Sequence, residues 1–258
     1  MILKTADCSI TMIENAPPGL QKIAANLEVD CNRYLPIVIS GIEGNIFNSN
    51  LDMYPWSELL PQTREGKTAS SSDDSYYGYL TWVGKPVCRQ HQPQLGKFGY
   101  VVDAYPRPDC LDVPMLLAID RQADKVLCEK IASGEQRDFS MGCLVQYVRC
   151  SFCGKKSASG PNEFCEHLSR NRGTWLHCKE GMEHNASAIN GDYVRVGEVC
   201  YGIRGQEMSA VHKGAFASSK TLEVLQEKSA SASVVVPTAV KLAVQTLTDF
   251  ISSSCDYR

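Results

Sequence analysis

Four residues in the middle of the chain have the types and the spacing of a metal site. Cys150 and Cys153 are separated by two residues, and farther along the chain Cys165 and His167 are separated by one. Three thiolates and one imidazole on a short polar loop match what a tetrahedral zinc ion needs, and four protein ligands leave no open coordination position. The pattern therefore predicts a structural zinc ion.

Two alternatives stay open for these residues. The cysteines can be thiols without a metal. The single residue between Cys165 and His167 is also shorter than the usual spacing of about two to four. If this short spacing keeps His167 from binding the metal, then His177, Cys178 or His184 would be the fourth ligand in its place.

Ser140 and His91 have the types of a nucleophile and its base. Ser140 lies in the segment Asp-Phe-Ser-Met-Gly-Cys, where Gly142 lets backbone approach a substrate or present amides to an oxyanion. A serine attacks only if a base takes its proton. Of the five histidines, His91 is best placed for this, in a turn between two expected strands. The alternative is that His91 is a surface-loop residue and that Ser140 begins a strand.

A histidine base also needs a group that orients its ring. Glu207 suits that role, because it follows an expected strand and would be partly buried. Asp103 and Asp138 are the competing acids.

Composition limits the class of protein. The chain has 258 residues, 43% of them hydrophobic and 21% charged, which fits one large domain or two small ones. The net charge is −3 and the basic residues are spread along the chain, so direct binding to nucleic acid is not expected. The basic residues near the four metal-site residues indicate a solvent-exposed face.

Most of the twelve cysteines are expected to be reduced thiols in a cytosol. Residues 1–20 lack a secretory signal and residues 113–119 are too short to span a bilayer, so no membrane anchor is expected.

The elements that would position these residues are mostly strands. Apolar and β-branched runs predict strands at residues 33–42, 76–83, 98–105, 113–119, 144–148, 193–196 and 199–203. Helical spacing predicts helices near residues 54–60, 123–133, 222–227 and 239–251.

Four sequence blocks between residues 76 and 215 resemble the prohead (capsid maturation) proteases of tailed bacteriophages. The blocks are His91 with Gly99-Tyr-Val-Val-Asp103-Ala, then Leu117-Ala-Ile-Asp120-Arg121, then Ile131-x2-Gly134-x3-Asp138-Phe-Ser140-Met-Gly142-Cys143, and finally Glu207-x-Ser209-x-Val211-x2-Gly214-Ala215. That family is similar in fold to the herpesvirus assembly protease, a compact β-barrel with helices around it. The resemblance implies that His91 is the general base and Ser140 the nucleophile of a serine endopeptidase.

The resemblance further implies cleavage of phage scaffold and major capsid proteins, self-cleavage, and self-association inside the prohead or virion in the host cytoplasm. The alternative is a non-enzymatic virion structural or assembly protein that keeps the protease fold. The expected fold class is α+β, a compact β-barrel core with surrounding helices. The expected domains are an N-terminal region packing on the core (1–75), the core (76–149 and 193–216), a zinc-binding insertion (150–192) and a helical tail (217–258).

Overall fold

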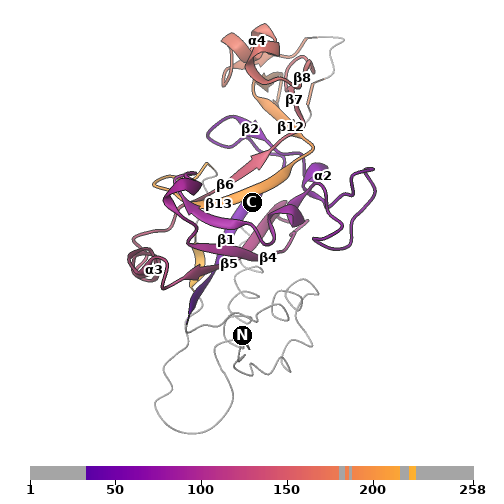
Figure 1. The fold of residues 1–258 in the computed structure, drawn as a ribbon. Helices are drawn as coiled ribbons and strands as arrows, with labels where there is room; N and C mark the ends of the chain where they lie inside the picture. Colours follow the sequence, from indigo (N-terminus) through magenta and orange to yellow (C-terminus); the bar gives the residue numbers. More distant parts are fainter. Residues whose placement is uncertain (1–32, 180–183, 186–187, 216–220, 225–258) are drawn as a thin grey trace.

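The computed structural model describes residues 33–179, 184–185, 188–215 and 221–224, and the chain is mostly β with few helices. Its main element is a seven-stranded sheet that curls into a half-barrel (Figure 1). The strand order is β14-β1-β5-β4-β3-β13-β6, and each neighbouring pair is antiparallel except β3 with β13. The strands are β1 (Tyr34–Glu43), β3 (Pro86–Arg89), β4 (Gly99–Ala104), β5 (Asp112–Asp120), β6 (Phe139–Leu144), β13 (Arg204–Ala210) and β14 (Thr221–Val224).

The long apolar strands β1 and β5 pair with each other inside this sheet and are buried almost throughout. Branched side chains favour the extended backbone, and burial of both faces explains why these runs lack polar alternation. Leu35, Ile39 and Leu117 are fully buried in the main hydrophobic cluster. Burial of each such side chain contributes about 1.5–3 kcal/mol, so the two strands are a major source of stability.

Register shifts bend the main sheet. One lies between Val101 and Asp103 in β4, and another lies between Gly205 and Glu207 in β13. Bulges of this kind increase the local twist and bend the strand, which accounts for the curl. Within the described residues the edge strands β14 and β6 share no ladder. The sequence predicts a compact β-barrel, whereas the described residues form an open, curled sheet.

A smaller unit, the distal module (residues 147–201), lies beyond one end of the main sheet (Figure 1). It holds a three-stranded sheet, β10-β11-β9, and most of a four-stranded sheet, β2-β12-β7-β8. Its own hydrophobic cluster forms around Phe152, Leu168 and Val196 and includes Met53 of β2. The module thus extends past both limits of the predicted insertion, 150 and 192. Its strands are β2 (Asp52–Met53), β7 (Tyr147–Cys150), β8 (Lys156–Ser157), β9 (Trp175–His177), β10 (Ile189–Asn190), β11 (Tyr193–Arg195) and β12 (Glu198–Tyr201).

Helices are short in the described part of the chain. They are α2 (Trp56–Leu59), α3 (Lys125–Ala132) and α4 (Glu166–Arg170), with 3-10 turns η1 (Tyr79–Trp82), η2 (Pro93–Leu95) and η3 (Gly160–Glu163). The predicted helix at residues 123–133 is confirmed as α3, which buries Leu127 and Ile131 at helical spacing. The predicted α+β class implies more helix than the described residues contain. No helix among these has the length and hydropathy that a bilayer crossing requires.

The strand predicted at residues 76–83 is wrong at its centre. Tyr79–Trp82 forms the 3-10 turn η1, which begins directly after Gly78, a residue with a φ of 88°. A Cβ atom at Gly78 would lie 2.3 Å from the carbonyl oxygen of Leu60, so the turn needs glycine for space as well as for conformation.

The predicted terminal regions also differ from the structure where it describes them. Thr221–Val224, placed in the helical tail, is the strand β14, because its backbone pairs with β1. The rest of the tail from 225 onward and residues 1–32 lie outside the described residues. Strand β1 belongs to the main sheet itself, whereas the sequence predicts an N-terminal region that packs against the core.

Candidate active site and metal site

Three neighbouring strands of the main sheet bring the predicted catalytic residues together. Strand β13 lies between β3 and β6, and it carries Glu207. His91 follows the end of β3, and Ser140 is the second residue of β6. Strand β6 leads into β7 of the distal module, and β12 of that module leads back into β13. Both strands that carry Glu207 and Ser140 therefore connect directly to the distal module.

Glu207 holds the imidazole of His91. The Nδ1 atom of His91 lies 2.6 Å from Oε1 of Glu207, and the side chains are 44% and 12% exposed. This hydrogen bond raises the pKa of His91 above its ordinary value of 6.5; burial opposes the rise, and the negative charge of Glu207 adds to it. With Nδ1 held by the acid, Nε2 is the ring nitrogen that can accept a proton from a nucleophile.

The turn that carries His91 has unusual backbone geometry. Gln90 and His91 have φ angles of 50° and 57°, in the left-handed region. Such non-glycine residues are strained by about 1–3 kcal/mol each and persist where their surroundings hold them. Here the amide of Gln90 donates to the carbonyl of Ala210 at 3.0 Å. The amide of His91 donates to Oγ of Ser209 at 3.1 Å. Strand β13 thus fixes both the ring and the backbone of His91.

The carboxylate of Glu207 is enclosed on its other sides. Its Oε2 atom accepts a hydrogen bond from the hydroxyl of Ser209, which is fully buried. Gly142 lies opposite Glu207 in the β6–β13 ladder, and a Cβ atom at Gly142 would meet Oε1 of Glu207 at 2.1 Å. The glycine in this position therefore leaves room for the carboxylate, in addition to any role toward an oxyanion.

Ser140 lies opposite Ser209 in the same ladder and is 8% exposed. Residues paired across an antiparallel ladder share a face and have Cβ atoms about 4.5–5.5 Å apart. Ser140, Ser209 and Glu207 are therefore on one face of the sheet. No hydrogen bond between the Ser140 hydroxyl and His91 is found within the described residues. Such contacts are often long in enzymes without substrate and tighten when substrate binds.

The competing acids have other partners. The carboxylate of Asp103 accepts from the amide of Ala104 at 2.8 Å, and it is buried on β4. The carboxylate of Asp138 accepts from the amide of Gly214 at 3.3 Å. Glu207 is the acid whose carboxylate contacts the His91 ring.

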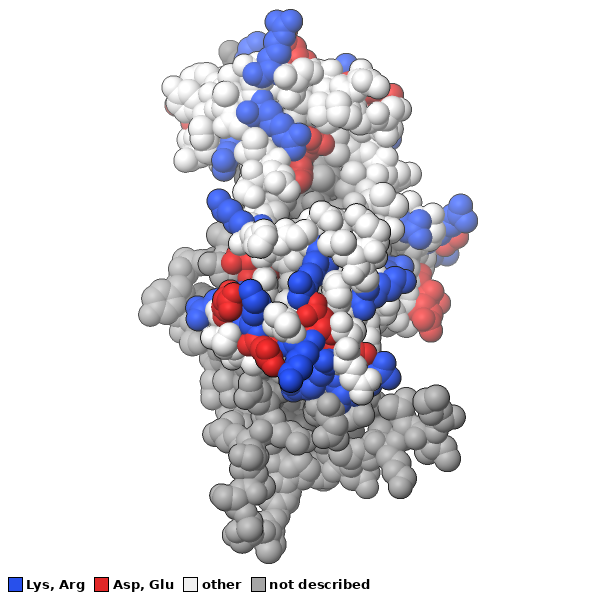
Figure 2. All heavy atoms as spheres, turned by 60° about the vertical axis from the view of Figure 1, so that its left-hand side comes forward, with Lys and Arg blue, Asp and Glu red and all other residues white. Residues whose placement is uncertain are grey.

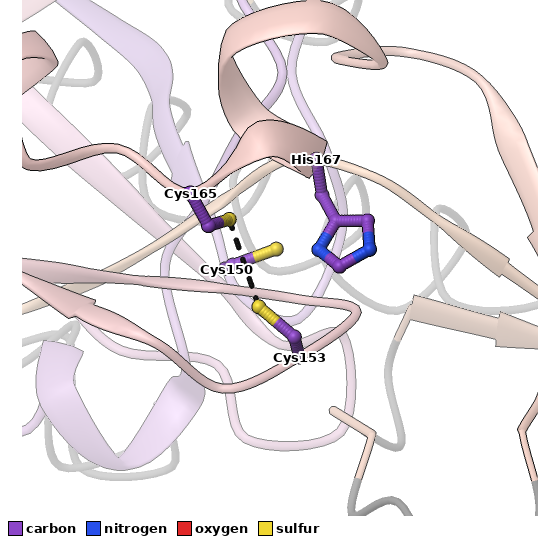
Figure 3. Close-up of side chains that lie close together, drawn as sticks. All are labelled: Cys150, Cys153, Cys165 and His167. Carbon is purple, nitrogen blue, oxygen red and sulfur yellow. Dashed lines mark hydrogen bonds between the residues drawn. The ribbon is translucent and has the colours of Figure 1, made fainter.

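The four predicted metal ligands converge at the start of α4. The ligand atoms of Cys150, Cys153, Cys165 and His167 all lie within 4.8 Å of one another (Figure 3). The Sγ atoms of Cys153 and Cys165 are 3.6 Å apart. Two sulfurs bound at about 2.3 Å to one tetrahedral zinc ion would be about 3.8 Å apart, so the spacing already fits a shared ion.

The surroundings of these side chains also fit a metal. Backbone amides of Phe152 and Cys153 donate to the Cys150 sulfur, and those of His167 and Leu168 donate to the Cys165 sulfur. Hydrogen bonds of this kind favour thiolates, the form that binds metal. At Cys165 burial opposes them but the pKa of the thiol is lowered, whereas at Cys150 burial outweighs them and raises the pKa of the thiol to about 12. The Nδ1 atom of His167 is buried and has no hydrogen-bond partner among the described residues, and one ring nitrogen faces the sulfurs (Figure 3). A metal would satisfy this atom.

The alternative ligands lie elsewhere. Nδ1 of His184 contacts the carbonyl of Phe152 at 2.6 Å, and Nε2 of His184 accepts from the amide of Lys179 at 3.2 Å. Nδ1 of His177 contacts the carbonyl of Cys178 at 2.9 Å. Among the described residues the cluster consists of the four residues predicted first. His184 instead packs on Phe152, which lies between the rings of His167 and His184.

Two contributors to the candidate active site were missed by sequence reasoning. Ser209 stands two residues after Glu207 on a strand, so alternation places both side chains on one face. That spacing was a usable signal. The contact between Gly142 and Glu207 depends on the register of β6 against β13, which only the folded sheet defines.

Comparisons of this chain with protein-family models, with curated proteins and with solved structures found no match. The chemistry open to the site follows from its own groups. They are a histidine with an oriented ring, a serine on the neighbouring strand, and a separate four-ligand cluster in the distal module.

Proposed function

We propose that this chain is a serine endopeptidase in which Ser140 is the nucleophile, His91 the general base and Glu207 the group that orients His91. The observation that carries the proposal is the 2.6 Å hydrogen bond between Nδ1 of His91 and Oε1 of Glu207. A buried acid on Nδ1 leaves Nε2 for the nucleophile, which is the arrangement a serine hydrolase needs.

In the proposed reaction the Ser140 hydroxyl attacks the carbonyl carbon of a peptide bond while Nε2 of His91 takes its proton. The imidazolium then gives this proton to the departing amine, and water hydrolyses the acyl-enzyme by the reverse sequence. Backbone amides near residues 140–142 would stabilise the oxyanion, at about 3 kcal/mol each. The carboxylate of Glu207 stabilises the imidazolium through its contact with Nδ1.

The proposed substrates are phage scaffold and major capsid proteins, together with the chain itself, inside the prohead in the host cytoplasm. Support for this part comes from the resemblance of the four sequence blocks to prohead proteases. Direct binding to nucleic acid is not proposed. On the face shown in Figure 2, basic and acidic side chains are interspersed over the lower part of the molecule, and the upper part carries scattered basic side chains with some acidic ones among white residues.

The experiment is incubation of the purified chain with the scaffold and capsid precursor proteins encoded beside it, followed by intact-mass measurement. Ser140→Ala and His91→Ala are compared with the parent, and Ser40→Ala serves as the control, since Ser40 is a buried serine of β1. We expect cleavage by the parent and Ser40→Ala, and a loss on the order of 10⁶-fold in Ser140→Ala. A folded parent that leaves every precursor intact would overturn the proposal.

We also propose that the metal is zinc and that its role is structural. Four protein ligands, three of them thiolates, leave no position for water or substrate. Metal analysis of the purified chain should find one zinc per chain, and Cys153→Ser should lose it. Cys178→Ser is the matched control, because Cys178 is another half-buried cysteine of the distal module but lies outside the cluster. Equal metal content in both variants would contradict the assignment.

A second candidate function is a non-enzymatic assembly protein of the virion. It is favoured by exposed large side chains on the small sheet of the distal module. Trp175, Ile189 and Tyr193 are 47%, 41% and 49% exposed, which hydrolysis does not require. The cleavage experiment separates the two functions, because the assembly protein would leave every precursor intact.

A further inference from the structure

Ser209 contacts both members of the His91–Glu207 pair with one hydroxyl group. It is fully buried in β13, two residues after Glu207. Its hydroxyl donates to Oε2 of Glu207, and its oxygen accepts from the amide of His91 at 3.1 Å. It also lies opposite Ser140 in the ladder. Ser209 therefore connects the acid, the base and the nucleophile strand.

We propose that Ser209 is a positioning residue that fixes the Glu207 carboxylate and the His91 backbone in one geometry. The inference rests on the proposed function for its catalytic meaning. A serine hydroxyl has one proton to donate and lone pairs to accept with. Here its proton points at Glu207 and its oxygen accepts from the amide of His91, so its proton is not directed at Nε2 of His91. Ser209 is on these grounds not a second nucleophile.

Each contact of Ser209 restricts one motion: rotation of the Glu207 carboxylate or displacement of the His91 backbone. Without the hydroxyl the carboxylate of Glu207 keeps His91 as a partner but can rotate, because Ser209 is the residue of the described part of the chain that holds Oε2. The amide of His91 would lose its acceptor in a turn that already has two left-handed residues. Both changes act on the distance and angle between Nδ1 of His91 and Oε1 of Glu207. A small error in that geometry misplaces Nε2 relative to the nucleophile.

Among the described residues, few charged groups surround the His91 ring. A change in the pKa of His91 therefore reports a change in its contact with Glu207. Glu207 faces the imidazole from β13. Arg89, two residues earlier, is paired with Asp124 at the start of α3. Among the ionisable groups, Glu207 is the one that sets the direction of the His91 titration.

The test is an NMR titration of the His91 ring in full-length protein with labelled histidine, assigned with His91→Gln. Ser209→Ala is compared with Ser40→Ala, which deletes another buried serine hydroxyl in the same sheet, far along the strand order on β1. All samples carry Ser140→Ala, so that self-cleavage does not interfere. Ser209→Thr retains the hydroxyl and provides the test should Ser209→Ala fail to fold.

The expected result is a fall of the His91 pKa toward 6.5 in Ser209→Ala, with the parent value kept in Ser40→Ala and Ser209→Thr. With the Ser140 hydroxyl restored, Ser209→Ala should lose on the order of 10²-fold in kcat with little change in KM. Its pH–rate profile should move to lower pH together with the NMR titration.

Three outcomes would overturn the role of Ser209. They are an unchanged His91 titration in folded Ser209→Ala, an equal change in Ser40→Ala, and a changed titration in folded Ser209→Thr. Failure of the proposed function is a separate result. If the parent cleaves no precursor but the titration shifts in Ser209→Ala alone, Ser209 still positions the pair and the endopeptidase proposal fails.

Discussion

At the scale of single residues, the Glu207 carboxylate is held from three directions. The ring of His91 contacts Oε1, and the hydroxyl of Ser209 donates to Oε2. Gly142 has only a hydrogen atom where any other residue would place Cβ against the carboxylate. Burying a carboxyl group costs free energy unless hydrogen bonds or an opposite charge compensate it. The arrangement therefore leaves one orientation for the carboxylate, and that orientation points at the histidine.

Gly142→Ala tests this enclosure. The new methyl group would meet Oε1 of Glu207 at 2.1 Å, and the side chain of Glu207 can yield where the backbone of β6 cannot. We expect a folded protein in which the hydrogen bond to His91 is broken and the cleavage rate falls by roughly 10²–10⁴-fold. Kinetics with a scaffold-derived peptide measure the loss.

A double-mutant cycle identifies the cause of that loss. In the Glu207→Ala background the methyl group at residue 142 has no carboxylate to displace, so Gly142→Ala should have little further effect. A full additional loss in that background would show that Gly142 acts through something other than Glu207.

The raised pKa of His91 predicts the pH dependence of stability. The hydrogen bond to Glu207 favours the protonated ring in the folded state, so the stabilisation is fully present below the ordinary value of 6.5. It is lost as the pH rises through the higher folded pKa. The unfolding free energy of the parent minus that of His91→Gln should therefore be largest at acidic pH. Urea denaturation between about pH 5.5 and 8.5 measures it. A difference that grows with pH would contradict the assignment.

At the scale of elements, α3 and β3 are linked by one carboxylate. Asp124 caps α3, since its Oδ1 atom accepts from the amide of Leu127 at 2.9 Å. Its Oδ2 atom pairs with Arg89, the last residue of β3 before the turn of His91. The start of the helix thus holds the end of the strand that leads to His91, the proposed base.

Asp124→Ala should lower the unfolding free energy by about 1–2 kcal/mol, because it removes the cap and leaves Arg89 without this partner. Asp124→Asn retains a capping oxygen and loses only the charge, so its effect should be smaller. Thermal and urea denaturation of the two variants provide the comparison. If both substitutions were equally destabilising, the ion pair and not the cap would account for the effect.

The success of sequence reasoning differed between elements for physical reasons. Strands β1 and β5 could be predicted because their branched apolar runs are buried on both faces. The turn η1 could not, because its aromatic and β-branched residues suit a strand, and the sequence signal for the turn is the single residue Gly78 before it. Strand β14 could not be predicted because its pairing with β1 is a long-range contact that local periodicity does not contain.

At the scale of the whole molecule, the described residues form two hydrophobic clusters, one under the main sheet and one in the distal module. Arg172 of the module donates to the carbonyl of Asn50 at 2.6 Å and to the carboxylate of Asp52 at 3.0 Å, and it pairs with Glu198. The loop that carries β2 is thereby attached to the module. The spacing of the cysteines and the histidine predicted the four-residue cluster from sequence, but the extent of the module required the structure.

Metal removal should affect the two clusters unequally. The cluster around Phe152 surrounds the ligands, whereas the main sheet has its own core. Chelation should therefore remove hydrogen-exchange protection across residues 147–201 and leave β1 and β5 protected. Hydrogen exchange followed by mass spectrometry, before and after chelation, resolves the regions. Equal loss of protection in both would mean that the chain folds as a single cooperative unit.

The direct connection of β6 to β7, and of β12 to β13, has a consequence for how the protein folds. Ser140 and Glu207 lie on two arms of one long hairpin, and the distal module is its closing loop. Joining the arms across an unstructured loop of about 60 residues has a length-dependent entropy cost of roughly 3–4 kcal/mol. A module that is already folded brings the ends of the arms together and removes most of that cost. The supply of metal during synthesis would then determine how quickly the two arms pair, long before any substrate arrives.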